Sequence, residues 1–364
     1  MKTLFSPFAV LILLFTLASC QQKRDKDYPI QPVPFTSVEL NDDFWAPRIR
    51  KNHEVTIPIA FQKSEETGRI KNFKIAGGLE EGSFASPAPF DDSDVFKIIE
   101  GASYSLQMFD DPELEAYLDT LIHYIGLAQE EDGYLYTNRT IMGDSAHPWA
   151  GDERWELTHD LSHELYNLGH MYEAAVAHYQ ATGKRSFMDI ALKSAHLVDS
   201  VFGWDKIENY PGHQEIEIGL VKLYRATGKK KYLDLAKFFL DVRGPEGPKY
   251  CQAHKKVTNQ TQAVGHSVRA AYMYTGMADV AALTEDPGYV EAINTIWEDI
   301  VHKKLYVTGG IGASGGNEGF GEPYDLPNMT AYCETCASIA NVFWNHRMFM
   351  HEGDVKYYDV LERT

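Results

Sequence analysis

The chain has 364 residues, which is enough for one large domain or two ordinary ones, and its 44% hydrophobic and 24% charged residues are typical of an ordinary globular protein. Its formal net charge is -18. This charge argues against nucleic acid and anionic membrane surfaces as partners, because a protein that binds phosphate groups needs a basic face.

Residues 1–19 predict an export signal. Lys2 gives a positive start, and the apolar run that follows is shorter than a membrane-spanning helix requires. The segment ends in Leu-Ala-Ser before Cys20, which looks like a bacterial lipoprotein signal, so cleavage there would leave the Cys20 thiol lipidated. A plain secretory signal with a chance cysteine is the alternative. Either way we expect an exported protein, periplasmic or held at the outer membrane by that lipid alone, with residues 20–35 as a polar tether.

Residues 36–364 predict one domain, because no long linker rich in Ser, Gly or Pro divides them. Val38 and Leu40 alternate with polar residues, which predicts a short β segment near its start. Phe44 and Trp45, which follow, are expected to insert into the core.

After a long loop over residues 76–92, rich in Gly, Pro and Ser, the chain predicts helices in pairs. Apolar residues recur at three- and four-residue steps, and segments 161–183 and 185–203 form one such hairpin. The tetrapeptide ATGK occurs at residue 181 and again at 226, 45 residues later, which indicates a repeated unit. Such hairpins pack as an open solenoid or as a closed toroid. Their length and unequal loops favour an all-α fold, an (α/α)6 toroid whose inner helices surround a cavity.

Three Gly-His pairs follow this repeat, at His170, His213 and His266, which are 43 and 53 residues apart. Positions repeated in this way face a common cavity in a toroid. His163 lies seven residues before His170 and shares its helix stripe, so it is a further candidate. A structural histidine with satisfied hydrogen bonds is the alternative for any one of them.

Asp92, Ser93 and Asp94 stand at the expected start of a helix, and any of them could cap it. If this helix start opens onto the cavity, one aspartate could instead bind sugar hydroxyls, and Asp94 is the residue that we assign to this role.

Residues 316–338 gather acids and thiols in a stretch rich in turn residues. Glu318 suits a general acid, and a cysteine thiolate can serve as a zinc ligand or a nucleophile. Glu334 and Cys336 would point about 200° apart in the middle of a helix, so a shared site requires turn or cap geometry, which the preceding Pro and Asn favour. A disulfide between Cys333 and Cys336 is the alternative.

An ordered set of motifs resembles the family 127 glycoside hydrolases, once catalogued as a domain of unknown function, and the related family 146. The motifs are FTSVELNDDFWAPRI, DSDVFKIIEGASY, DGYLYT, HELYNLGHMYEAAVAHY, YPGHQEIEIGLVKLYRATG and the run from YDLPN to ETCAS. The resemblance covers about residues 36–364. It implies a β-L-arabinofuranosidase acting on plant arabinan, pectin or glycoprotein sugars, with an (α/α)6 catalytic barrel followed by β-sandwich domains.

The resemblance also implies roles for single residues. Glu318 becomes the general acid/base, and Glu334 and Cys336 become zinc ligands. The histidines of the Gly-His pairs line the sugar subsite: His170, His213 and His266, with His163 competing with His170. The implied mechanism is retaining, with a zinc-bound cysteine thiolate as nucleophile.

The sequence departs from the family pattern in one respect. The family's nucleophile belongs to a Cys-Cys pair well downstream of ETC, and no cysteine follows Cys336 here. We therefore expect a truncated catalytic domain without the last barrel helices, the β-sandwiches and the nucleophile. Two other functions stay open, namely a carbohydrate-binding lipoprotein without catalysis and another α/α-toroid glycan-degrading enzyme, such as a lyase or an unsaturated glucuronyl hydrolase.

Overall fold

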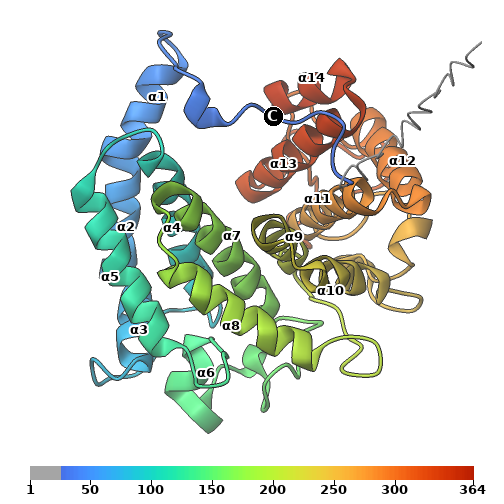
Figure 1. The fold of residues 1–364 in the computed structure, drawn as a ribbon. Helices are drawn as coiled ribbons and strands as arrows, with labels where there is room; N and C mark the ends of the chain where they lie inside the picture. Colours follow the sequence, from blue (N-terminus) through green and yellow to red (C-terminus); the bar gives the residue numbers. More distant parts are fainter. Residues whose placement is uncertain (1–25) are drawn as a thin grey trace, which may run out of the picture.

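The computed structural model describes residues 26–364, and within them every regular element is a helix (Figure 1). The α-helices are α1 Trp45–Lys51, α2 Ile57–Glu66, α3 Arg69–Ala76, α4 Asp92–Leu106, α5 Pro112–Ala128, α6 Thr137–Met142, α7 Glu164–Thr182, α8 Ser186–Val201, α9 Ile216–Thr227, α10 Lys230–Asp241, α11 Ser267–Thr284, α12 Pro287–Lys303, α13 Thr335–Glu352 and α14 Val355–Arg363. The long loop predicted over 76–92 lies between α3 and α4.

The helices form two concentric layers, and this confirms the predicted all-α toroid fold. The inner layer runs α4, α7, α9, α11, α13, each packed against the next, and the outer layer runs α5, α8, α10, α12, α14 (Figure 1). The residues of α11 are buried all the way from Ser267 to Leu283, as expected of a helix that is enclosed on every side. The ends of these inner helices position the site described below.

Inner helices α7 and α9 approach each other unusually closely at Gly169 and Gly219. A Cβ atom on Gly219 would lie 2.5 Å from the Gly169 carbonyl oxygen, and one on Gly169 would lie 2.7 Å from the Ile216 backbone nitrogen. Any larger residue would therefore push the two helices apart. The glycine of this Gly-His pair is explained by helix packing rather than by a ligand.

The predicted β segment near the start of the domain is wrong. Residues Phe35–Ser37 form a single 3-10 turn, η1, and Val38 and Leu40 follow it as extended chain that belongs to no strand. Both side chains are largely exposed, so their alternation with polar residues does not report a buried face. An extended segment needs a neighbouring strand to complete its hydrogen bonds, and the isolated bridges within residues 26–364 all lie elsewhere.

The expectation that Phe44 and Trp45 insert into the core is also wrong. Their side chains are more than half exposed and pack against each other, with ring centroids 4.9 Å apart. The Arg48 guanidinium lies 3.7 Å from the Phe44 ring centroid. These two rings therefore cover one another at the surface.

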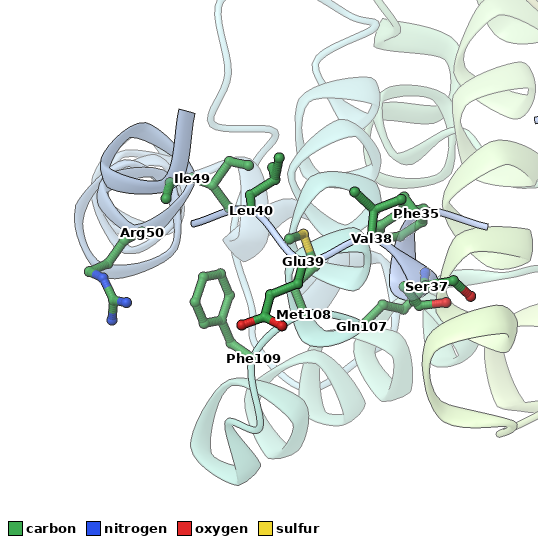
Figure 2. A pocket seen from close by; sticks show the side chains of 12 residues that line it. Phe35, Ser37, Val38, Glu39, Leu40, Ile49, Arg50, Gln107, Met108 and Phe109 are labelled. Atoms are coloured by element: carbon green, nitrogen blue, oxygen red, sulfur yellow. The ribbon is translucent and has the colours of Figure 1, made fainter. Parts of the chain in front are cut away.

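A cavity of about 490 Å³ lies between residues 35–40, α1 and residues 107–109 (Figure 2). The side chains around it are mostly apolar, among them Val38, Leu40 and Met108 (Figure 2). Glu39 is its one carboxylate, and no histidine lines it. This cavity therefore lacks a second carboxylate or a histidine to act with Glu39 in acid–base chemistry.

The predicted tether, residues 20–35, is described from Lys26 onward, and this part contacts the barrel. Tyr28 is buried, and its hydroxyl donates to Asp279 Oδ1 at 3.0 Å. The backbone N–H of Ile30 donates to the carbonyl of Met350 at 3.1 Å. The predicted signal and Cys20 lie outside the described residues. Within the described chain, no helix combines the length and apolar character needed to cross a membrane.

Candidate active site

The N-terminal ends of the inner helices surround a cavity of about 330 Å³. Side chains from eight stretches of the chain line it, most of them charged, aromatic or histidine: Phe90, Asp91, Ser93, Asp94, Lys97, Trp149, Leu161, His163, Tyr166, His213, Tyr250, His266, Val268, Arg269, Glu318, Glu334 and Cys336. Most of the residues predicted from the sequence therefore meet in one place, although they are up to 242 positions apart, between Asp94 and Cys336.

Three histidines form a row along the cavity, which we call the histidine row: His163, His213 and His266. The ring centroids of His163 and His213 are 5.4 Å apart, and those of His213 and His266 are 5.8 Å apart. Each histidine comes immediately before an inner helix or within three residues of its start. His163 is the residue before α7 and adopts a left-handed conformation, with φ 57°.

His170 lies behind this row and does not line the cavity. It sits inside α7, where its ring packs against Tyr166 and its Nδ1 lies 3.2 Å from Glu215 Oε1. Glu173 and Lys222 complete this buried cluster, with 2.5 Å between the Lys222 ammonium and the Glu173 carboxylate. The structure therefore corrects the predicted register of the repeat, because His163, not His170, is the counterpart of the two later histidines.

Burial keeps the three imidazoles of the histidine row neutral. It lowers the pKa of His163 to about 3 and the pKa of His266 to about 4, and the nearby Arg269 charge acts in the same direction. The pKa of His213 also falls well below its usual value, chiefly through burial. His163 Nδ1 lies 2.6 Å from the Leu161 carbonyl and His213 Nδ1 lies 3.0 Å from the Gln214 carbonyl, so each Nδ1 donates and each Nε2 is left as an acceptor. Such a wall suits hydroxyl donors.

Glu318 is held against the end of this row by a tightly constrained loop. Its carbonyl accepts hydrogen bonds from the backbone N–H and the hydroxyl of Ser267, at 3.0 and 2.9 Å. The next residue must be glycine, because a Cβ atom on Gly319 would lie 2.2 Å from the Gly265 carbonyl oxygen. Glu318 itself has φ 51°, a conformation that is unusual for this residue type and is typical of functional sites.

The Glu318 carboxylate pairs with His266. Its Oε2 lies 2.8 Å from His266 Nε2, while the Nδ1 of the same ring accepts the Arg269 backbone N–H. The imidazole proton is therefore on Nε2 and is donated to the carboxylate. The Glu318 side chain remains 45% exposed, so it can still reach a ligand in the cavity.

Glu334 and Cys336 converge at the start of α13. Glu334 is the residue before the helix and is extended, with φ -57° and ψ 140°, whereas Cys336 lies in the first helical turn. This is the cap geometry that the turn residues predict. Glu334 Oε2 is buried without a hydrogen-bond partner, and oxygens or nitrogens of Glu334, Glu318 and His266 lie within 4.8 Å of one another. Burial and the adjacent Glu334 raise the pKa of the Cys336 thiol to about 11.

Cys333 does not share this position. It does not line the cavity, its backbone has φ 43°, and its Sγ packs against Gly310. Cys333 and Cys336 are both free thiols, so the alternative of a disulfide between them is not formed here.

The two aspartates in the first turn of α4, Asp92 and Asp94, have different surroundings. Asp94 lines the cavity and pairs with the Arg69 guanidinium at 2.6 Å. Asp92 is buried and accepts hydrogen bonds from the backbone and the hydroxyl of Thr137. Burial raises the pKa of Asp92 to about 7. Neither side chain caps α4, and only Asp94 is placed where a ligand could reach it.

Other lining residues were missed by the sequence reasoning. Tyr166 lies three positions after His163, and its ring centroid is 4.4 Å from that of His213. The Lys97 ammonium lies 4.9 Å from the centroid of the Tyr166 ring. Helical spacing from His163 and Asp94 could have identified these two residues. Trp149 lies in the short 3-10 turn Pro148–Ala150, which is too short to show periodicity, so no such signal exists for it.

Comparisons with known proteins show the family of this chain. Residues 37–364 match the catalytic domain of the family 127 glycoside hydrolases, described as β-L-arabinofuranosidase. The chain belongs to this family. One relative is a non-reducing end β-L-arabinofuranosidase from Bifidobacterium longum subsp. longum. It is 36% identical over an alignment of 381 residues, and the match covers 96% of this chain and 55% of that protein.

Two solved structures of family 127 enzymes are similar along nearly the whole chain. One β-arabinofuranosidase is 57% identical with a TM-score of 0.90, and the match covers 93% of this chain and 54% of the other. A β-L-arabinofuranosidase from Geobacillus stearothermophilus T6 is 43% identical with a TM-score of 0.85, covering 90% and 55%. The chain therefore spans about half the length of the relatives it matches.

Proposed function

We propose that this chain carries the acid/base half of a retaining β-L-arabinofuranosidase site that removes L-arabinofuranose from a plant-type glycan. Family membership supports the reaction class, because the matched relatives are named for this activity. The observation that carries the proposal is the pairing of Glu318 with His266 at the wall of a cavity lined by neutral histidines.

Each group in the cavity has a chemical task in this proposal. Glu318, when protonated, donates its proton to the glycosidic oxygen as the bond from that oxygen to the anomeric carbon breaks. The carbon passes to a nucleophile, and the Glu318 carboxylate later takes a proton from the water that releases the sugar. His266 holds the carboxylate in place between these steps. The acceptor nitrogens of His163 and His213 bind sugar hydroxyls. We assign no nucleophile within residues 26–364, because Cys333 does not line the cavity and Cys336, which does, is assigned to zinc.

Glu334 and Cys336 fit two of the ligands of a zinc ion. The unpartnered Oε2 of Glu334 and the thiol beside it are donors of the type that zinc binds. Zinc, when bound, would hold a thiolate deprotonated at neutral pH. A mononuclear site takes at least three protein ligands, so this pair supplies only part of the set.

We also propose that the protein is exported and that Cys20 carries a lipid anchor. The signal-like residues 1–19 and the cysteine that follows support this proposal. Mass spectrometry of the protein expressed in a bacterium tests it. We expect a mature N-terminus at Cys20 with an acyl mass, whereas an unmodified Cys20 would contradict the anchor.

The acid/base assignment is tested in a version of the protein extended to the full length of its relatives, which can supply the nucleophile, by release of L-arabinose from an aryl β-L-arabinofuranoside. Glu318→Gln should lower kcat by about 10²- to 10⁴-fold with little change in the affinity for arabinofuranosides, because the amide cannot transfer the proton. The matched control is Glu322→Gln, four residues further along the same loop and absent from the cavity lining. Release at the wild-type rate by Glu318→Gln would rule out the assignment. Binding without release by the wild type would favour the carbohydrate-binding alternative.

The zinc assignment is tested by the metal content of a version of the protein extended to the full length of its relatives, after purification and dialysis. We expect Glu334→Gln and Cys336→Ser each to lose bound zinc, and Cys333→Ser to keep it, since that thiol lies outside the cavity. Equal zinc content in all three variants and the wild type would contradict the assignment.

A further inference from the structure

Two aromatic rings stand at one end of the cavity, and neither has a role in the reaction described above. We call Trp149 and Phe90 the aromatic ledge. Their rings are nearly parallel, with an interplanar angle of 7° and centroids 6.2 Å apart. Phe90 in turn stacks on His163, with centroids 4.3 Å apart and an angle of 21°. The ledge therefore continues the histidine row outward from its His163 end.

The outer ring of the ledge is exposed but held in a fixed position. Trp149 is 42% exposed and lines the cavity. The carbonyls of Ala150, Gly151 and Asp152 accept hydrogen bonds from one guanidinium, that of Arg139, at 2.5–3.0 Å. The loop that carries Trp149 is thus preorganised, as expected of a residue that contacts a ligand.

Charged groups line the same cavity as the ledge, namely Asp91, Asp94 and Lys97. The Asp91 carboxylate lies 3.1 Å from the Arg69 guanidinium, and Asp94 pairs with the same arginine at 2.6 Å. Lys97 stands 3.7 Å from Asp94. A flat apolar ring next to polar groups matches the chemistry of a sugar, which has a face of C–H bonds and an edge of hydroxyls.

We propose that the aromatic ledge binds a second sugar ring of the same glycan, next to the arabinofuranose that contacts the histidine row. This inference rests on the proposed function. Glu318 pairs with His266, whereas Phe90 of the ledge stacks on His163. The second ring is joined to the arabinofuranose through the oxygen that Glu318 protonates, and Trp149 and Glu318 line the same cavity. A ring on Trp149 therefore contributes to recognition of the glycan beyond that bond and not to proton transfer.

Calorimetry with two ligands tests the ledge separately from the reaction. The ligands are methyl β-L-arabinofuranoside, with one ring, and a β-linked arabinofuranose oligosaccharide. Trp149→Ala should weaken binding of the oligosaccharide by about 3- to 10-fold, the range that loss of one aromatic contact gives, and should leave binding of the one-ring ligand unchanged. Trp149→Phe should retain most of the affinity.

Trp204→Ala is the matched control, because Trp204 is 56% exposed and packs against Phe238 away from the cavity. It should change binding of neither ligand. Equal weakening of both ligands by Trp149→Ala, or no weakening of either, would overturn the ledge inference while the proposed function stands. Failure of the wild type to bind either ligand would instead overturn the proposed function, and the ledge inference with it.

Discussion

The two ends of the inner helices differ in whether their polar groups are paired. At the N-terminal ends, His163 and Glu318 adopt left-handed backbone conformations, and Glu334 keeps a buried oxygen without a partner. Burial also holds the histidines there far below their usual pKa. Each of these features costs stability, and together they surround the cavity.

At the C-terminal ends, the charged groups are paired. Asp279 of α11 lies 2.9 Å from the Arg225 guanidinium of α9 and 2.8 Å from that of Arg347 of α13. Tyr28 of the N-terminal segment donates a third contact. Although burial opposes ionisation, the charges of Arg347 and Arg225 hold the pKa of Asp279 below its usual value. The same helices therefore line the cavity at one end and are joined by ion pairs at the other. We call Asp279, Arg225, Arg347 and Tyr28 the clamp.

This difference shows where the molecule can tolerate strain. Strained or unpaired groups persist only where the surrounding structure enforces them. The clamp fixes α9, α11 and α13 relative to one another, so their opposite ends can hold an unfavourable arrangement. Substitutions at the two ends should accordingly have different effects.

The largest expected effect is at the clamp. Asp279→Ala would remove the carboxylate that pairs with Arg225 and Arg347 and leave the charges of both arginines without it. We therefore expect the free energy of unfolding to fall by about 3–5 kcal/mol. Urea denaturation followed by circular dichroism measures this. The control is Asp234→Ala, an exposed partner of Lys230 on α10, which should cost less than about 1 kcal/mol. If both variants lost only a similar, small part of the free energy of unfolding, the clamp would not stabilise the C-terminal ends of the inner helices.

A smaller effect, dependent on pH, is expected at the cavity. The folded pKa of His163 is about 3, below the unfolded value of about 6.5, so between these values the unfolded chain binds a proton that the folded chain does not. Stability is therefore lost as the pH falls from 6.5 toward 4. His163→Asn, which tolerates the left-handed backbone, should reduce that loss by about 2 kcal/mol between pH 6.5 and 4.5.

Thermal unfolding across this pH range measures the difference. His123→Asn is the control, since this residue is exposed on the outer helix α5 and should keep the wild-type dependence on pH. If the stability of His163→Asn fell with pH as much as that of the wild type, burial of His163 in the cavity would not be the cause of the loss.

The smallest expected effect concerns the N-terminal segment. Tyr28→Phe removes one hydrogen bond from Asp279 but leaves both arginines, so we expect a loss of about 1 kcal/mol in the free energy of unfolding. Differential scanning calorimetry measures it, with the exposed Tyr358→Phe as control. A loss as large as that of Asp279→Ala would make the N-terminal segment, rather than the ion pairs, the main element of the clamp.

Much of the fold could be predicted from local signals. The helix predicted to end at Gly183 does so, with that glycine in a left-handed cap at the end of α7. Helical periodicity also identified the pairs of inner and outer helices. The β segment predicted from Val38 and Leu40 is wrong, because alternation over so few residues does not show whether a partner strand exists.

The candidate site was predicted only in part. Glu318, Glu334 and Cys336 line one cavity, as their motif suggested, but the repeat of Gly-His pairs pointed to His170 instead of His163. That error has a physical cause. In the first pair the glycine serves the close contact of α7 with α9, whereas in the other two it precedes the helix, so identical dipeptides occupy different structural positions.

By itself, the sequence determined the helices, their order and the acids and thiols available, because these depend on residues that are near neighbours in the chain. Tertiary structure alone decided which side chains share the cavity. The His266 ring reaches Glu318 across 52 positions, and the loops bearing Trp149 and Phe90 meet beside His163. Such contacts depend on how the inner helices pack, which no local pattern encodes.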